Sequence, residues 1–176
     1  MIRLIDPRAA YLARLLVALD QLEAKPPAQA WPLILAHAAY ESGWGRTRQA
    51  MRARNHFNIS AGASWRGPTI EGGDTEYRPG SSTPARIVQQ WRVYASDREA
   101  IGDYLTLLGA RRYRPAREAL WAGDAEAFVR ALGPDRAHES PPVGGYYTLP
   151  TAEYLTGFLA ALGEVRAHLP AEMPAS

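Results

Sequence analysis

The sequence contains no cysteine, which excludes disulfide bonds, thiolate nucleophiles and cysteine-ligated metal sites. Its longest apolar segments are far shorter than the roughly 18 to 20 residues that cross a bilayer, so we expect no membrane span. The four histidines show no metal-ligand spacing such as HExxH. No P-loop, and no GxGxxG or GxSxG motif, follows a strand-like segment. We therefore expect neither a metal nor a cofactor.

Lysine is almost missing, because Lys25 is the only one among 20 basic residues, and the formal net charge is only +2. This small excess gives no reason to expect binding to nucleic acid. The arginines gathered at 46–54 and 111–117 are interpreted as solvated helix faces. We also expect no signal peptide, because Asp6 and Pro7 precede any hydrophobic region in the given sequence.

The 176 residues suit one domain, expected over residues 1–169, with a disordered tail at 170–176. Periodic apolar positions and capping signals predict several helices. They are expected over residues 7–22, 31–42, from Ser96 onward, 114–121, 124–132 and 151–168. Between them, residues 62–94 are rich in glycine, threonine and aromatics, which favours a small antiparallel sheet or hairpin. The predicted fold class is α+β, with a cleft between the helical and β parts.

Glu41 follows the apolar run "WPLILAHAAY" and precedes two glycines that end the helix. Burial disfavours the charged form of a carboxyl group and raises its pKa, so that the group can act as a general acid near neutral pH. Two other interpretations remain open at this point. Glu41 could form an ion pair with Arg46 or Arg48, or it could pair with His37 one helical turn earlier. His37 itself is interpreted as a core histidine.

Glycoside hydrolysis pairs a protonated carboxyl group with a second, ionised one. The segment "IEGGDTEY" offers three candidates, Glu71, Asp74 and Glu76, and the last two share one side of a strand. Aromatic side chains in or beside the loops and the β segment suit the faces of sugar rings. They are Trp44, Trp65, Tyr77, Trp91, Tyr146 and Tyr147.

Four segments, in order, make the chain resemble glycoside hydrolase family 73, the glucosaminidase domain of bacterial autolysins, the flagellar peptidoglycan hydrolase and some phage lysins. They are "LAHAAYESGWGRTRQA", "NHFNISAGASWRGPTIEGGDTEY", "WRVYASDREAIGDYLTLLGARRYRPA" and "GGYYTLPTAEY". The resemblance runs from about residue 31 to 158. It implies a lysozyme-like α+β fold with a mainly helical lobe and a β-hairpin lobe flanking a substrate cleft. It also implies hydrolysis of the β-1,4 bond after N-acetylglucosamine in peptidoglycan.

Matched residue by residue, the resemblance makes Glu41 the general acid and Glu76, in "TEY", the second carboxylate. It places the tyrosine of the family's "YAT" motif on Tyr146, beside the cleaved bond, although Tyr147 competes for that role. Asn55 and Phe57 match an element that shapes the cleft wall. Trp44, Trp65 and Tyr147 complete the predicted substrate-binding set. Leu149 stands where the family often has aspartate, and the altered spacing in "PTAEY" leaves Tyr154 outside the assignment.

Three activities are compatible with the sequence. The first is an endo-β-N-acetylglucosaminidase that acts on peptidoglycan strands as a monomer. The second is a muramidase or lytic transglycosylase of similar fold, which cuts the other β-1,4 bond. The third is a non-catalytic wall-binding module, against which the presence of both Glu41 and Glu76 argues. We expect action at the cell wall, in the periplasm or outside the cell. Export would use phage lysis, specialised secretion or the flagellar apparatus.

Overall fold

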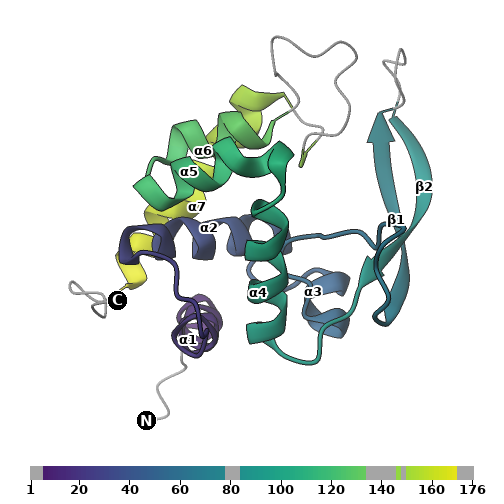
Figure 1. Ribbon diagram of the computed structural model, residues 1–176, viewed down its shortest axis with the longest axis horizontal. Coiled ribbons are helices and arrows are strands. Elements are labelled where there is room, and N and C mark those ends of the chain that lie inside the picture. Colours follow the sequence, from purple (N-terminus) through teal and green to yellow (C-terminus); the bar gives the residue numbers. More distant parts are fainter. Residues whose placement is uncertain (1–5, 78–83, 134–145, 148–149, 170–176) are drawn as a thin grey trace.

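Helix α2 lies at the centre of the helical part, with other helices packed around it and a hairpin at one side (Figure 1). The computed structural model describes residues 6–77, 84–133, 146–147 and 150–169; of residues 74–77 and 84–87 it describes the backbone alone. The tail predicted at 170–176 lies outside these ranges. The elements in chain order are α1 (Pro7–Asp20), η1 (Ala28–Ala30), α2 (Trp31–Ser42), α3 (Arg48–Ala53), β1 (Thr69–Tyr77), β2 (Pro84–Arg92), α4 (Asp97–Leu108), η2 (Arg111–Tyr113), α5 (Arg114–Ala122), α6 (Ala125–Leu132) and α7 (Thr151–His168).

Helix α2 begins and ends where the sequence predicts. Pro32 occupies its first turn, where a missing amide N–H breaks no helical hydrogen bond. Gly43 ends it with a φ of +55°, the left-handed conformation that glycine adopts at little cost. Nine of its twelve residues are buried, so the helix is covered on nearly all sides. Glu41 is therefore carried in the last turn of a helix that runs through the core.

Strands β1 and β2 form an antiparallel pair whose register is unbroken from Thr69 opposite Arg92 to Tyr77 opposite Pro84. The amide of Ala61 donates to the carbonyl of Gln90 at 2.8 Å, which ties the preceding loop to the base of the hairpin. The turn between the strands lies outside the described residues. This arrangement of helical part and two-stranded sheet confirms the predicted α+β class.

Capping residues and apolar periodicity predicted the positions of most of the remaining helices. The Ser96 hydroxyl caps α4 by accepting from the amide of Glu99 at 3.1 Å. The Glu99 carboxylate accepts from the amide of Ala95, one residue before the expected partner of a capping box. Helix α7 has the predicted bounds, 151–168. Helix α3 was not predicted, because only Ala50 and Ala53 are buried in its six residues and give no apolar stripe.

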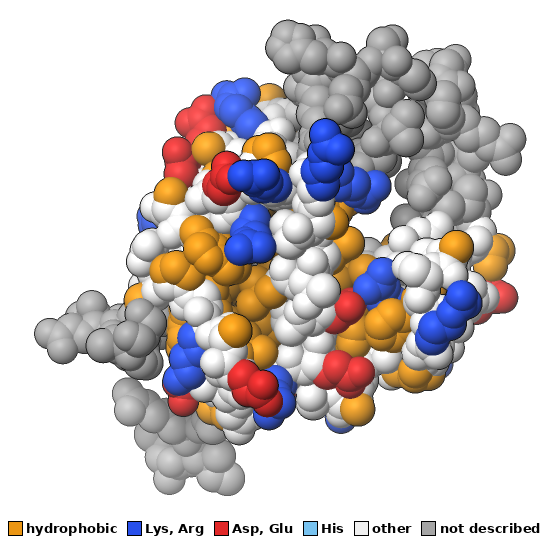
Figure 2. Space-filling view, in the orientation of Figure 1, with side chains coloured by type: hydrophobic (Ala, Val, Ile, Leu, Met, Phe, Trp, Pro, Cys, Tyr) orange, Lys and Arg blue, Asp and Glu red, His pale blue; other side chains and the backbone are white. Residues whose placement is uncertain are grey.

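The arginines over residues 111–117 are exposed, as predicted for a solvated helix face. Figure 2 shows basic and acidic side chains interspersed over this part of the surface. One such pair joins Arg114 to Glu118 at 3.2 Å along α5. The arginines of 46–54 are also exposed. In the part of the chain that the structure describes, no helix is long and apolar enough to cross a membrane.

Two glycines of α7 provide a matched test of packing. A Cβ on Gly157 would come within 2.4 Å of the Tyr40 ring on α2, whereas a Cβ on Gly163 would meet nothing within 4 Å. Alanine favours a helix over glycine by about 0.5–1 kcal/mol, so Gly163→Ala is expected to raise the free energy of unfolding by that amount. Gly157→Ala is expected to lower it by about 1–3 kcal/mol, because the ring must move. Urea denaturation of both variants measures the difference; equal effects would contradict the close packing of α2 on α7.

Candidate active site

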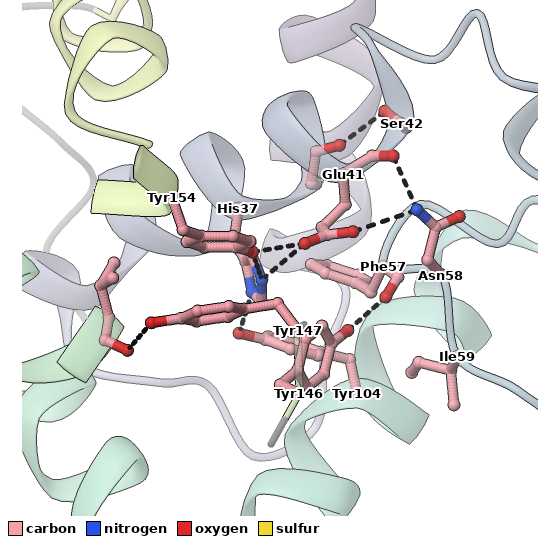
Figure 3. A network of polar contacts seen from close by, with 12 residues as sticks. His37, Glu41, Ser42, Phe57, Asn58, Ile59, Tyr104, Tyr146, Tyr147 and Tyr154 are labelled. Carbon is pink, nitrogen blue, oxygen red and sulfur yellow. Dashed lines mark hydrogen bonds and ion pairs between the residues drawn. The ribbon is translucent and has the colours of Figure 1, made fainter. Parts of the chain in front are cut away.

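The Glu41 carboxylate is held by two donors from distant parts of the chain. The Asn58 side-chain amide donates to Oε2 at 3.0 Å, and the Tyr154 hydroxyl donates to Oε1. Figure 3 shows the two donors converging on the carboxylate, Asn58 from a loop and Tyr154 from α7. The Glu41 side chain is 13% exposed. It is therefore fixed in orientation while one edge remains accessible.

The arginines near Glu41 in sequence do not pair with it. Arg46 donates instead to the carbonyl of Gly43 at 3.0 Å, and Arg48 donates to the carbonyl of Glu71 at 2.8 Å. The ion-pair interpretation with these two residues is thus wrong. The interpretation with His37 is closer, since His37 Nε2 lies 3.7 Å from Glu41 Oε1.

The loop that carries Asn58 is shaped by Asn55. The fully buried Asn55 side chain donates to the carbonyls of Ile59 and Arg92, at 2.8 and 3.1 Å, and accepts from the amide of Ile59 at 2.9 Å. Asn58 takes a left-handed backbone conformation with a φ of 49°, which asparagine tolerates better than most residues. Its side chain also donates to the Glu41 carbonyl at 2.9 Å. Asn55, which the resemblance predicts at the cleft wall, positions the loop. Asn58, which was not predicted, contacts the acid.

Tyr154, which sequence analysis left out of the site, is the second group that contacts the acid. Burial raises its pKa well above the ordinary tyrosine value, and the nearby charge of Glu41 raises it further. The hydroxyl therefore keeps its proton and serves as a donor. The Tyr147 ring stacks on the Tyr154 ring, with centroids 3.8 Å apart, and fixes its position.

The pKa of Glu41 is lowered in this structure, and the sequence-based prediction of a raised pKa is wrong. Burial does raise the pKa of this carboxyl group, as predicted. Together, however, His37, Tyr154 and Asn58 stabilise the charged form by more than burial disfavours it. Glu41 is therefore ionised at neutral pH without substrate. Below its lowered pKa it can hold a proton and donate it.

Tyr146 lies beside the same cluster. Its hydroxyl donates to the carbonyl of Phe57, and its ring centroid lies 4.9 Å from that of His37. Burial and then the charge of Glu41 raise the pKa of Tyr146 well above the ordinary value. Phe57 is 1% exposed and stacks on Tyr104 with centroids 3.9 Å apart. The structure thus brings Tyr146 near Glu41, while Phe57 supports the wall behind it.

The remaining aromatic candidates lie at different depths. Tyr147 is 8% exposed, and its hydroxyl donates to the carbonyl of Val129 at 3.0 Å, so its ring supports Tyr154 from within the core. Trp44 is partly buried; its ring makes a T-shaped contact with the Tyr11 ring, with centroids 6.3 Å apart, and Arg8 lies over its face. Trp65 is also partly buried; its Nε1 donates to the carbonyl of Pro68 at 3.1 Å, and the Arg92 guanidinium lies 4.8 Å from its ring centroid. Neither tryptophan contacts Glu41 in the contacts described.

The acidic residues of the hairpin lie at fixed strand positions. Glu76 stands opposite Ala85 and Asp74 opposite Ile87, and both side chains lie outside what the structure describes. Glu71 stands opposite Gln90 and is exposed. Side chains alternate between the two faces of a strand, and the register is unbroken. Glu76 and Asp74 therefore occupy positions on one face of β1, and Glu71 occupies a position on the other.

No group of three metal-ligating side chains occurs among the residues whose positions are described. His56 pairs with Asp97 at 2.9 Å, and His168 pairs with Asp6 at 2.9 Å. His138 lies outside the described ranges. A hollow of about 1270 Å³ between α1, α3 and the start of α4 is lined by arginines and by Asp97, and Glu41 is not part of its lining. The candidate site therefore rests on the hydrogen-bonded cluster around Glu41.

Comparison with known proteins gives related sequences and folds. The family model described as mannosyl-glycoprotein endo-beta-N-acetylglucosaminidase matches residues 20–139. The peptidoglycan hydrolase FlgJ of Salmonella typhimurium is 41% identical over 107 residues, which cover 57% of this chain and 33% of FlgJ. FlgJ of Escherichia coli K12 is 39% identical over 128 residues, 70% of this chain and 39% of FlgJ. The match thus spans between about a third and two fifths of the length of these relatives.

Solved structures show the same architecture. A mutant peptidoglycan hydrolase from Sphingomonas sp. A1 superposes with a TM-score of 0.67 at 28% identity, covering 91% of this chain and 97% of that one. The catalytic domain of the autolysin Auto from Listeria monocytogenes superposes with a TM-score of 0.68, covering 96% of this chain and 89% of that one. Its identity of 17% shows likeness of fold alone.

Proposed function

The chain belongs to the glucosaminidase family of glycoside hydrolases, and we propose that it hydrolyses the β-1,4 bond after N-acetylglucosamine in peptidoglycan. The observation that carries the proposal is Glu41, a carboxyl group at the end of a buried helix, oriented by Asn58 and Tyr154 and still 13% exposed. The similarity to FlgJ, a peptidoglycan hydrolase, supports the choice of polymer. The protein then acts where that polymer lies, at the cell wall.

In this mechanism Glu41 protonates the glycosidic oxygen as the bond breaks. The free site favours the ionised form, so the carboxyl group takes up a proton in acid or when bound sugar excludes water and raises its pKa. Glu76 is assigned as the ionised partner that activates water or stabilises the developing positive charge on the sugar. The alternative nucleophile is the 2-acetamido oxygen of the substrate itself, since substrate-assisted routes occur among glycosidases. Tyr146 and Trp44 are assigned to sugar contacts at the edge of the site.

Digestion of purified peptidoglycan tests this function. Mass spectrometry of the released fragments is expected to show N-acetylglucosamine at the reducing ends. Reducing-end muramic acid would identify a muramidase, and its anhydro form would identify a lytic transglycosylase. Binding to the polymer without release of soluble fragments would identify a wall-binding module. Each of these three results would overturn the proposal.

Asn58 offers a separate test, because its amide orients the acid. Asn58→Gly keeps the left-handed backbone and removes the donor to Glu41, and we expect kcat/KM to fall about tenfold or more. A hydrogen bond to a charged group contributes roughly 1.5–3 kcal/mol, and 1.4 kcal/mol is about a factor of ten. Each enzyme is assayed at its own pH optimum, so that a shift in pKa does not mask the loss. Unchanged kcat/KM would show that Asn58 does not orient Glu41 during catalysis.

A further inference from the structure

A series of hydrogen bonds runs through a buried histidine, His37, which connects two tyrosines, and it ends at the catalytic acid. His37 Nδ1 lies 2.8 Å from the Tyr104 hydroxyl, and Nε2 lies 2.9 Å from the Tyr154 hydroxyl. The Tyr154 hydroxyl in turn donates to Glu41 Oε1. His37 and Tyr104 are fully buried, and Tyr154 is 2% exposed. Figure 3 shows this series of side chains, from Tyr104 on α4 through His37 on α2 to Tyr154 on α7 and then to Glu41 on α2.

The donors and acceptors of this chain are all satisfied in one arrangement. The Tyr104 hydroxyl makes its hydrogen bond with His37 Nδ1. Its proton therefore has a partner when the hydroxyl donates to Nδ1. Nε2 then carries the proton of a neutral imidazole and donates to the Tyr154 oxygen. Tyr154 in turn directs its proton to Glu41. The tautomer follows from the network, because each alternative leaves a buried donor or acceptor unpaired.

We propose that His37 is a positioning residue, which directs the Tyr154 hydroxyl toward Glu41 and thereby sets the pH at which the catalytic acid gives up its proton. The inference deepens the proposed function and rests on it. His37 touches no reacting atom in this scheme and acts through Tyr154. Its Nε2 also lies 3.7 Å from Glu41 Oε1, so the imidazole is close to the carboxylate as well as to the Tyr154 hydroxyl.

The groups that face His37 from the surrounding elements are consistent with this role. Its own helix α2 contributes Glu41, α4 contributes Tyr104, and α7 contributes Tyr154. The segment before α7 contributes Tyr146, whose ring lies 4.9 Å away between centroids. Among these titratable neighbours Glu41 alone ionises near neutral pH, because burial raises the pKa of each of the three tyrosines.

The pH dependence of kcat/KM tests the proposal, because it reports the essential groups of the free enzyme. Activity that needs protonated Glu41 falls as pH rises through the Glu41 pKa. Tyr154→Phe removes the donor to the carboxylate. His37→Gln removes the imidazole that fixes the donor's direction. Both substitutions weaken interactions that lower the Glu41 pKa, so each is expected to move the alkaline limb up by about one pH unit.

His56 provides the matched control. It is also fully buried, and it has a partner at both ring nitrogens, Tyr11 at Nδ1 and Asp97 at Nε2. His56→Gln makes the same chemical change outside the Glu41 cluster and is expected to lower stability without moving the limb. A limb that stays in place in folded His37→Gln, or that moves equally in His56→Gln, would overturn the proposal.

A second measurement does not depend on the substrate. Nitrogen chemical shifts of ¹⁵N-labelled histidine, assigned by comparison with His37→Gln, are expected to show the neutral Nε2–H tautomer for His37. Tyr104→Phe removes the hydroxyl that selects this tautomer and is expected to give a mixture. An Nδ1–H tautomer in the unaltered protein would overturn this inference even if peptidoglycan is cleaved as proposed. Conversely, absent cleavage with the Nε2–H tautomer would overturn the proposed function alone.

Discussion

Replacing Glu41 with glutamine is expected to lower kcat for peptidoglycan hydrolysis by about 10²- to 10⁴-fold, the usual contribution of a positioned acid. The amide oxygen of glutamine can still accept from Asn58 or Tyr154, so the fold is retained while the transferable proton is lost. The measurement is the rate at which reducing ends are released from purified peptidoglycan.

Two controls make this result specific. Glu118→Gln changes the same residue type at an exposed position on α5, and activity is expected to stay at the original level. The thermal midpoint of Glu41→Gln is expected to lie close to that of the original chain, which separates lost chemistry from lost folding. Near-original release of reducing ends by folded Glu41→Gln would rule out Glu41 as the general acid.

The second large effect is expected at the hairpin. Glu76→Gln is expected to lower kcat by about 10²-fold or more, the low end of the range for a positioned acid or base. Glu71→Gln is the matched control, because Glu71 lies on the same strand at a position of the opposite face and is exposed. Its substitution is expected to leave kcat within about twofold, since exposed positions away from the chemistry tolerate change.

The comparison of these two variants also tests the assignment of roles. A larger loss of kcat in Glu71→Gln than in Glu76→Gln would show that the second carboxylate is Glu71 and that the assignment of Glu76 is wrong. Equal, small losses in both would favour the substrate's own acetamido group as the nucleophile. In that case Glu41→Gln alone would retain a large effect.

Signals carried by neighbouring residues made much of the fold predictable. Pro32 and Gly43 bounded α2, Ser96 began α4, and the apolar stripe of residues 151–168 gave α7 its observed bounds. The glycine, threonine and aromatic residues of 62–94 predicted the hairpin. Helix α3 was not predicted, because six residues with two buried alanines are too short for a periodic pattern.

Helix caps, glycines and apolar spacing act over a few residues, so the longer helices, the hairpin and the position of Glu41 could be predicted from the sequence. The groups that surround the acid could not be predicted, because they come from distant segments of the chain. Asn58 and Tyr154 lie 17 and 113 residues from Glu41 in the chain, and no local pattern reports such contacts. For the same reason the direction of the Glu41 pKa shift was predicted wrongly. Burial can be inferred from an apolar run, whereas the three groups that outweigh burial meet only when α2, α7 and the Asn58 loop pack together.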